Sequence, residues 1–196
     1  MTIGLLVLAA GRSERFGSDK RVALFSDGRG MLQATVESAV SSGFPVRVCL
    51  RRGEQRLTEK LIQAGVERII SCPGAKKGMG GSISDGVAAS HDWKGLLLIL
   101  GDMPFVKVGT YVALADSLSE NQIAIPVYNG IRGNPVAFGR RFFSGLEKLN
   151  GDVGAREVVV ASKSSVREVV VPDRGIHEDI DTQDELNRFL YRANRV

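Results

Sequence analysis

Apolar and polar residues follow one another in a pattern typical of strands that alternate with helices. The first apolar run, Leu5 to Leu8, predicts a central strand that is buried on both faces of a sheet. Further strands are expected at Val46 to Leu50 and at Arg68 to Ser71, and the apolar spacing between them predicts helices that end near Gly43 and Gly65. This alternation predicts a parallel sheet with helices on both faces, which binds ligands at the carboxyl ends of its strands.

The second half of the chain continues the pattern with one more central strand. The run from Gly95 to Leu100 is the most continuous apolar stretch. The elements expected after it are a helix around Tyr111 to Leu118, a strand at Gln122 to Pro126, a hairpin turn at Asn129-Gly130, an apolar strand after Pro135, a helix at Arg140 to Leu149, an edge or extension strand at Val166 to Val171, and a last helix whose start is a capping box of Thr182 and Glu185.

The first strand leads into a glycine loop that carries cations. Two small residues precede Gly11, so a ligand can approach the backbone amides closely, and Arg12, Arg15 and Lys20 follow within nine residues. Backbone donors and cations together suit a polyphosphate. The glycine spacing fits neither a Walker A loop nor a dinucleotide fingerprint. A glycine-rich turn with solvated arginines is the alternative.

A second glycine-rich loop, from Cys72 to Ser82, follows the third strand. Ser82, with Asp85 three residues on, is expected to be the N-cap of a helix that continues through Ala89. A glycine-rich loop that precedes a helix N-terminus predicts a site for an anion or a polar ligand. An ordinary capped turn explains the same pattern of residues equally well.

Carboxylates stand at two further points where metal chemistry is expected. Asp102 directly follows the central strand 95–100 and its Gly101, which suits a metal ligand, although it also suits a turn cap before Pro104. Asp179 and Asp181 share one face in extended geometry, and they repel each other unless they are solvated or bound to a cation.

Size and composition indicate one globular unit over residues 1–196. The chain has 196 residues and 43% hydrophobic content, which allows one well-buried core. No signal-type or membrane-spanning segment is evident, so a cytoplasmic location is expected. Cys49 and Cys72 have no nearby histidines and are interpreted as buried thiols. The net charge of +4 comes from scattered basic pairs such as Lys20-Arg21, which favour small anions over nucleic acid.

Several motifs, in order along nearly the whole chain, resemble those of one family. The segment Leu-Ala-Ala-Gly-x-x-x-Arg-Phe-Gly-x-x-Lys at residues 8–20 is similar to the signature of the molybdenum cofactor nucleotidyltransferases, within the nucleotide-sugar pyrophosphorylase superfamily. The matching later segments are Gly-Met-Gly-x-Ser at 78–82, Gly-Asp-Met-Pro-Phe at 101–105, Gly-Asn-Pro at 133–135, Gly-Asp-x-Gly-Ala-Arg at 151–156 and Asp-Ile-Asp-Thr at 179–182. Gly81 stands where a serine is common, and Gln183 replaces a proline of the last motif.

The resemblance implies a fold, a reaction and a set of site residues. The implied fold is a Rossmann-like three-layer α/β sandwich of the nucleotide-diphospho-sugar transferase type, with a mostly parallel central sheet. The implied reaction transfers CMP from CTP to the phosphate of molybdopterin and releases pyrophosphate. The nucleotide-binding residues would be Leu8, Ala9, Ala10, Gly11, Arg12, Lys20, Gly78, Met79, Gly80 and Ser82. Catalysis would depend on Lys20, Arg12 and Asp102, with Mg²⁺ held by Asp102 and Asp181.

The resemblance also bears on the acceptor, the nucleotide base and the partners. Asn134 and Asp152 would lie near the acceptor, although a turn amide before proline and a helix start explain them equally well. Ala10, together with Gly-Met-Gly, is typical of the cytidine branch, whereas the guanosine branch has glycine in the place of Ala10. A molybdoenzyme of the xanthine dehydrogenase type is a possible recipient. The alternatives are a nucleotidyltransferase that uses GTP or a sugar-1-phosphate, and a non-catalytic molybdenum cofactor chaperone.

Overall fold

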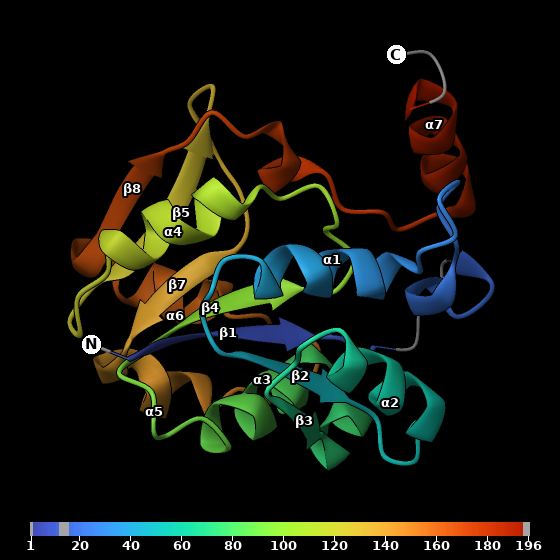
Figure 1. Cartoon of the computed structure of the whole chain (residues 1–196). Helices are drawn as coiled ribbons and strands as arrows, with labels where there is room; N and C mark the ends of the chain where they lie inside the picture. Colours follow the sequence, from blue (N-terminus) through green and yellow to red (C-terminus); the bar gives the residue numbers. More distant parts are fainter. Residues whose placement is uncertain (1, 12–15, 194–196) are drawn as a thin grey trace.

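A twisted sheet forms the centre of the molecule (Figure 1). The computed structural model describes residues 2–11 and 16–193, the last four of them by backbone only. Within that part, the strand order is β3-β2-β1-β4-β7-β5-β6, and β8 pairs with β5. The strands are β1 (Ile3–Leu8), β2 (Val46–Leu50), β3 (Arg68–Ser71), β4 (Gly95–Leu100), β5 (Ile123–Tyr128), β6 (Ile131–Arg132), β7 (Val136–Gly139) and β8 (Val166–Val170).

The first four strands are parallel, so their carboxyl ends meet at one edge. β1 pairs in parallel with both β2 and β4, and β3 extends the same arrangement beyond β2. β7 runs antiparallel to β4, and β5 runs antiparallel to β7. The fold is therefore the expected α/β class, with a mostly parallel central sheet. β8 lies outside β5, which confirms the expected edge position.

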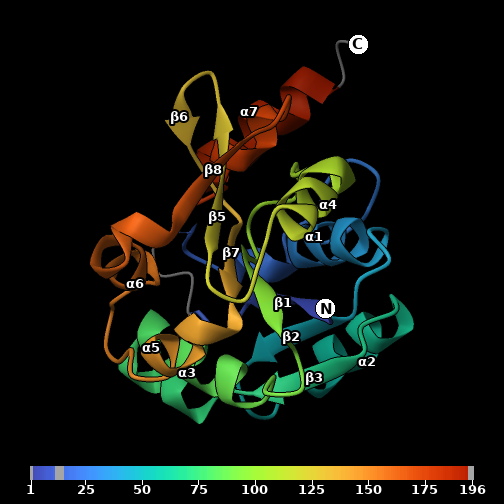
Figure 2. The same cartoon turned by 90° about the vertical axis from the view of Figure 1, so that its left-hand side faces the viewer.

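Helices cover both faces of the sheet and make three layers (Figures 1 and 2). One face packs against α1 (Met31–Val40), α2 (Gln55–Gln63) and α4 (Val108–Asp116), and the other against α3 (Met79–Ala88), α5 (Phe143–Leu146) and α6 (Arg156–Ala161). Side chains of β1 alternate between the two cores, with Leu5 and Val7 in one and Leu6 in the other. Apolar residues at every position of β1 are thus required, which explains its unbroken run.

The last helix, α7 (Gln183–Ala193), lies beside the end of the first loop (Figure 1). Its capping box is confirmed, because Glu185 N–H donates to Thr182 Oγ1 and the Glu185 carboxylate accepts from the backbone N–H of Thr182. Ile180 and Leu186 pack with Phe16 and Met31 in a small apolar cluster. That cluster joins the C-terminal segment to the segment that follows the glycine loop.

Two helix predictions need correction. The helix after the second glycine loop begins at Met79, and its N-cap is Gly78 with φ +108°. Ser82 is therefore inside the helix, and Asp85 instead accepts a hydrogen bond from Gly74 N–H at 2.7 Å. The helix expected at Arg140 to Leu149 is only a 3₁₀ turn at Arg140–Phe142 followed by the four-residue helix α5.

Smaller expectations are confirmed. Asn129 and Gly130 both have positive φ, as a hairpin turn of type I′ requires, and they join β5 to β6. Cys49 and Cys72 are buried free thiols. Among the described residues, none of the helices combines the length and the apolar character needed to span a bilayer.

Candidate active site

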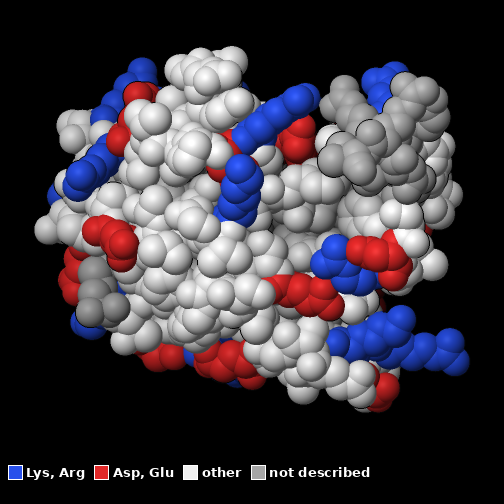
Figure 3. Space-filling model, turned by 45° about the horizontal axis from the view of Figure 1, so that its top comes forward, with Lys and Arg blue, Asp and Glu red and all other residues white. Residues whose placement is uncertain are grey.

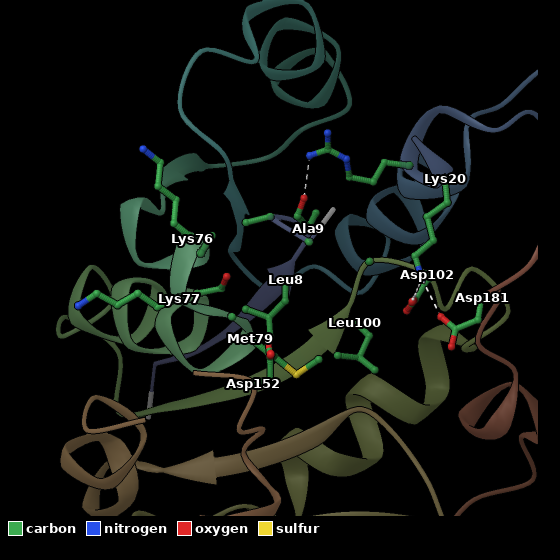
Figure 4. A pocket seen from close by; sticks show the side chains of 17 residues that line it. Leu8, Ala9, Lys20, Lys76, Lys77, Met79, Leu100, Asp102, Asp152 and Asp181 are labelled. Atoms are coloured by element: carbon green, nitrogen blue, oxygen red, sulfur yellow. Dashed lines mark hydrogen bonds and ion pairs between the residues drawn. The ribbon is translucent and has the colours of Figure 1, made fainter. Parts of the chain in front are cut away.

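A cavity of about 800 Å³ opens at the carboxyl edge of the parallel strands (Figure 4). Its walls come from the ends of β1 and β4, from the loop before α3 and its first turn, and from Asp152 and Asp181. Leu8, Ala9, Ala10 and Gly11 form one wall, as expected of a ligand-binding loop. The apolar ends of two central strands thus deliver both the glycine loop and Asp102 to the same space.

Lys20 joins the two carboxylates that the sequence assigns to a metal. Its ammonium donates to Asp102 Oδ2 at 2.5 Å and to Asp181 Oδ1 at 2.9 Å, and the three side chains are 17%, 16% and 26% exposed. Burial by itself lowers the pKa of Lys20, but the negative charges of Asp102 and Asp181 outweigh it and raise that pKa. The sequence shows no obvious partner for Lys20. In the fold, its ammonium forms ion pairs with two segments that are distant in the sequence.

The Asp102 carboxylate has an oxygen left for a ligand. Oδ1 is buried and accepts no hydrogen bond from any described residue. A buried carboxylate oxygen without a donor is costly unless a cation or a donor from a ligand satisfies it. Asp179 lies two residues before Asp181, and its pKa is raised first by loss of hydration and then by the charges of Asp102, Asp181 and Glu185. Negative charge is therefore concentrated at this end of the cavity.

The second glycine loop forms the opposite end of the cavity. Gly78, Met79 and Ser82 line it, and Figure 4 shows Met79 and Asp152 close together, away from Lys20. Gly80 does not line the cavity. Its N–H donates to Gly151 at 2.9 Å, and a Cβ there would lie 2.7 Å from the backbone nitrogen of Asn150, so its glycine serves close packing.

The two residues assigned to the acceptor lie in different places. Asp152 is in the main cavity, directly beside Gly78. Asn134 lines a second cavity of about 440 Å³, together with Met103, His177 and Asp179. Met103 follows Asp102 and Asp179 precedes Asp181, so the second cavity adjoins the carboxylate pair. Arg12 lies outside the described residues.

Three further basic residues line the cavity, and all three belong to basic pairs that the sequence associates with small anions. Lys76 and Lys77, one of these pairs, line it near Met79. Arg21 also lines the cavity, but it is buried and paired with Asp19 and Glu54. The interpretation of Lys20-Arg21 as a pair that binds anions is thus wrong for Arg21. No local pattern in the sequence indicates that Arg21 pairs with the distant Glu54.

On the face shown in Figure 3, basic and acidic side chains are interspersed rather than gathered into one basic field. Among the described residues, charged side chains gather at the carboxyl edge of the sheet and also around Arg47 at the opposite edge.

The sheet has a glycine loop, a lysine and two aspartates at its carboxyl edge, an arrangement that suits nucleotidyl transfer. The model of the MobA-like NTP transferase domain matches residues 5–166. The chain therefore belongs to this family and is a nucleotidyltransferase of the MobA-like superfamily.

Individual relatives match over nearly the full chain. Nicotine blue oxidoreductase of Paenarthrobacter nicotinovorans is 26% identical over 94% of this chain and 95% of its own length. Rv0371c of Mycobacterium tuberculosis H37Rv has a TM-score of 0.83 at 30% identity, over 97% of this chain and 98% of that one. A structure of Rv0371c in complex with manganese has a TM-score of 0.80 at 28% identity, over 97% and 99%.

Proposed function

We propose that this protein transfers CMP from CTP to the terminal phosphate of molybdopterin, with Mg²⁺ as its metal. The observation that carries the proposal is that Lys20 forms ion pairs with both Asp102 and Asp181. These residues line a cavity whose wall also contains the Leu-Ala-Ala-Gly segment at residues 8–11. A cationic group and two carboxylates beside a glycine loop suit a triphosphate with its metal.

The residues present fit a divalent cation. Asp102 and Asp181 already share one positive charge, and Asp102 Oδ1 is a buried oxygen without a described donor. Mg²⁺ commonly takes one or two carboxylates and completes its coordination with waters and substrate phosphates. When bound, the metal would neutralise charge on the triphosphate. The manganese complex of Rv0371c supports a divalent metal in a relative.

The reaction is an in-line displacement at the α-phosphorus of the nucleotide. A phosphate oxygen of the acceptor forms a new bond to this phosphorus, and the bond to the β-phosphate oxygen breaks and releases pyrophosphate. The acceptor phosphate is already anionic near neutral pH, so no general base is needed. Lys20, the Gly11 amide and Arg12 would hold the triphosphate and stabilise the leaving group.

The two ends of the main cavity suggest how the substrates lie. The end at Lys20, Asp102 and Asp181 would suit the phosphates once a divalent cation is bound to the carboxylates, and the end at Gly78, Met79 and Ser82 suits the base. Ala10 places a methyl group in the wall, and that group would crowd a purine more than a pyrimidine. The second cavity, which contains Asn134 and adjoins the carboxylates, suits the acceptor.

The proposal is tested by incubation of the protein with Mg²⁺, purified molybdopterin and each labelled nucleoside triphosphate. We expect the product to be the cytidine dinucleotide, with release of pyrophosphate and preference for CTP when CTP and GTP compete. A preference for GTP would refute the base assignment, and transfer to sugar-1-phosphates alone would refute the acceptor. Binding of molybdopterin that Mg²⁺ and nucleotide leave unchanged, without any product, would indicate a chaperone.

A further inference from the structure

Arg21 is a buried cation at the edge of the nucleotide cavity. Its side chain is only 5% exposed, and it directly follows Lys20 in the 3₁₀ turn η2 (Lys20–Val22). Its guanidinium donates from Nη1 to the Ala9 carbonyl at 2.8 Å and to Glu54 Oε2 at 2.8 Å, and from Nε and Nη2 to the Asp19 carboxylate at 2.8 and 2.6 Å. The carbonyl of Ala9, labelled in Figure 4, lies at the wall of the cavity.

These bonds join three segments that are separate in the sequence. Ala9 follows β1, Asp19 stands at the far end of the glycine loop, and Glu54 immediately precedes α2. Glu54 is itself held by Arg51, whose backbone N–H and Nε donate to it at 3.1 and 2.9 Å. A planar guanidinium can satisfy all these acceptors at once, whereas a lysine ammonium cannot.

The guanidinium of Arg21 is committed to these partners and not to a phosphate. Burial by itself lowers its pKa, but the carboxylates of Asp19 and Glu54 outweigh burial and raise the pKa, so the group stays charged. Its charge is neutralised inside the protein. Arg21 therefore acts on the site through what it holds in place.

We propose that Arg21 is a positioning residue for nucleoside triphosphate binding. Arg21 fixes the Ala9 carbonyl at the end of β1. Because Arg21 directly follows Lys20, it also fixes the backbone from which the Lys20 side chain extends. Lys20 then reaches Asp102 and Asp181 from a fixed backbone. The proposal rests on the nucleotidyltransferase class and on the role proposed for Lys20, and it is independent of the acceptor.

Arg47 provides a matched control within the same chain. It is also 5% exposed, donates to the carboxylates of Asp92 and Glu67, and donates to the carbonyl of Ala89 at 2.9 Å. It lies near the start of β2, at the opposite edge of the sheet from the cavity. The two arginines thus have similar burial and similar hydrogen-bond partners, although Arg47 also stacks over the Trp93 ring, and of the two only Arg21 lines the main cavity.

The test measures equilibrium binding of non-hydrolysable CTP and GTP analogues to Arg21→Lys, Arg21→Ala, Arg47→Lys and Arg47→Ala, with urea unfolding of each variant. We expect the substitutions at both arginines to lower the urea midpoint of unfolding. Only the Arg21 variants should weaken nucleotide binding, by about 10- to 100-fold. Millimolar guanidinium should restore binding to Arg21→Ala, since it can replace the missing fork, and should leave binding to Arg47→Ala unchanged.

Equal effects of the two arginines on nucleotide binding, or unchanged binding in the Arg21 variants, would overturn the proposal. If the Arg21 variants do not fold, Glu54→Gln decides, because it keeps the size of the side chain and removes one charged partner. Weakened nucleotide binding there supports the proposal, and unchanged binding overturns it. Because no acceptor is present, a failure to modify molybdopterin would count against the proposed function and not against Arg21.

Discussion

The ammonium of Lys20 is the point where three segments of the site meet, and its loss should affect both turnover and stability. We expect Lys20→Ala to lower turnover by about 10²- to 10³-fold, because one cationic contact to a developing charge is removed. The variant should also unfold at lower urea concentration, since the two ion pairs that the Lys20 ammonium makes with Asp102 and Asp181 would be lost.

Steady-state kinetics and urea unfolding of Lys20→Ala would measure the two effects. Lys107→Ala is a suitable control, because the exposed ammonium of Lys107 donates to the Pro172 carbonyl and Lys107 does not line the cavity. Near-normal turnover in a folded Lys20→Ala protein would contradict the role of Lys20.

Asp102 and Asp181 should behave as one metal site. Although 78 residues lie between them in the sequence, both accept from the same ammonium. Either change to asparagine should weaken binding of Mn²⁺ and the response to Mg²⁺, and the double variant should lose much less than the sum of the two single losses. Asp179→Asn is the internal control and should cost less.

Magnesium titrations of turnover and direct Mn²⁺ binding would check this prediction. Strictly additive losses, or an Asp181→Asn protein with an unchanged metal response, would leave Asp102 as the sole carboxylate ligand. That outcome would remove the two-carboxylate site while leaving the cavity and the family assignment intact.

At the scale of elements, the start of α7 determines where Asp181 stands. The Glu185 carboxylate accepts from the backbone N–H of Asp181 at 2.8 Å and from that of Thr182 at 2.9 Å. We expect Glu185→Ala to cost about 1 kcal/mol of stability, as for the loss of other helix caps, and to weaken Mn²⁺ binding because Asp181 is no longer fixed.

Asp184→Ala is the matched control for that prediction. Asp184 is an acid in the same first turn of α7, but it takes no part in the capping box. Calorimetric unfolding and Mn²⁺ titration of both variants would separate the two effects. Equal changes in metal binding would mean that charge at the helix N-terminus, and not the capping box, matters.

At the scale of the whole molecule, arginine–carboxylate clusters should make stability depend on acid pH. Hydrogen bonds from Arg47 lower the pKa of Asp92 to about 2, and those from Arg21 lower the pKa of Asp19. Burial by itself raises the pKa of Glu54, but Arg21 and Arg51 outweigh it and lower that pKa. A carboxylate with a lowered pKa in the folded state stabilises the fold above its unfolded pKa, near 4. This contribution is lost as the pH falls toward the folded pKa.

We therefore expect the urea midpoint to change little between pH 7 and 5 and to fall steeply between about pH 4 and 2. Asp92→Asn should reduce the midpoint at pH 7 and should flatten part of that fall. Unfolding curves at half-unit pH steps would measure both. A midpoint that stays constant down to pH 3 would show that these pairs do not stabilise the fold.

Local patterns determined the elements and most of their order. The continuous apolar runs of β1 and β4 predicted central strands because a strand covered on both faces must be apolar at every position. The hairpin turn at Asn129-Gly130 and the capping box of Thr182 and Glu185 were also predicted correctly, since each depends on residues only a few positions apart. The extent of the domain, over residues 1–196, stays a prediction.

Only the tertiary structure decided which residues share a cavity and which are already paired. The resemblance assigned Lys20, Asp102 and Asp181, from separate motifs, to one site, but only the fold shows that one ammonium lies between the two carboxylates. The sequence could not show that Arg21 is satisfied by Glu54, or that Asn134 and Asp152 lie in different cavities. Helix and strand formation follow from neighbouring residues, whereas charge pairing across the sheet depends on long-range packing that no local pattern records.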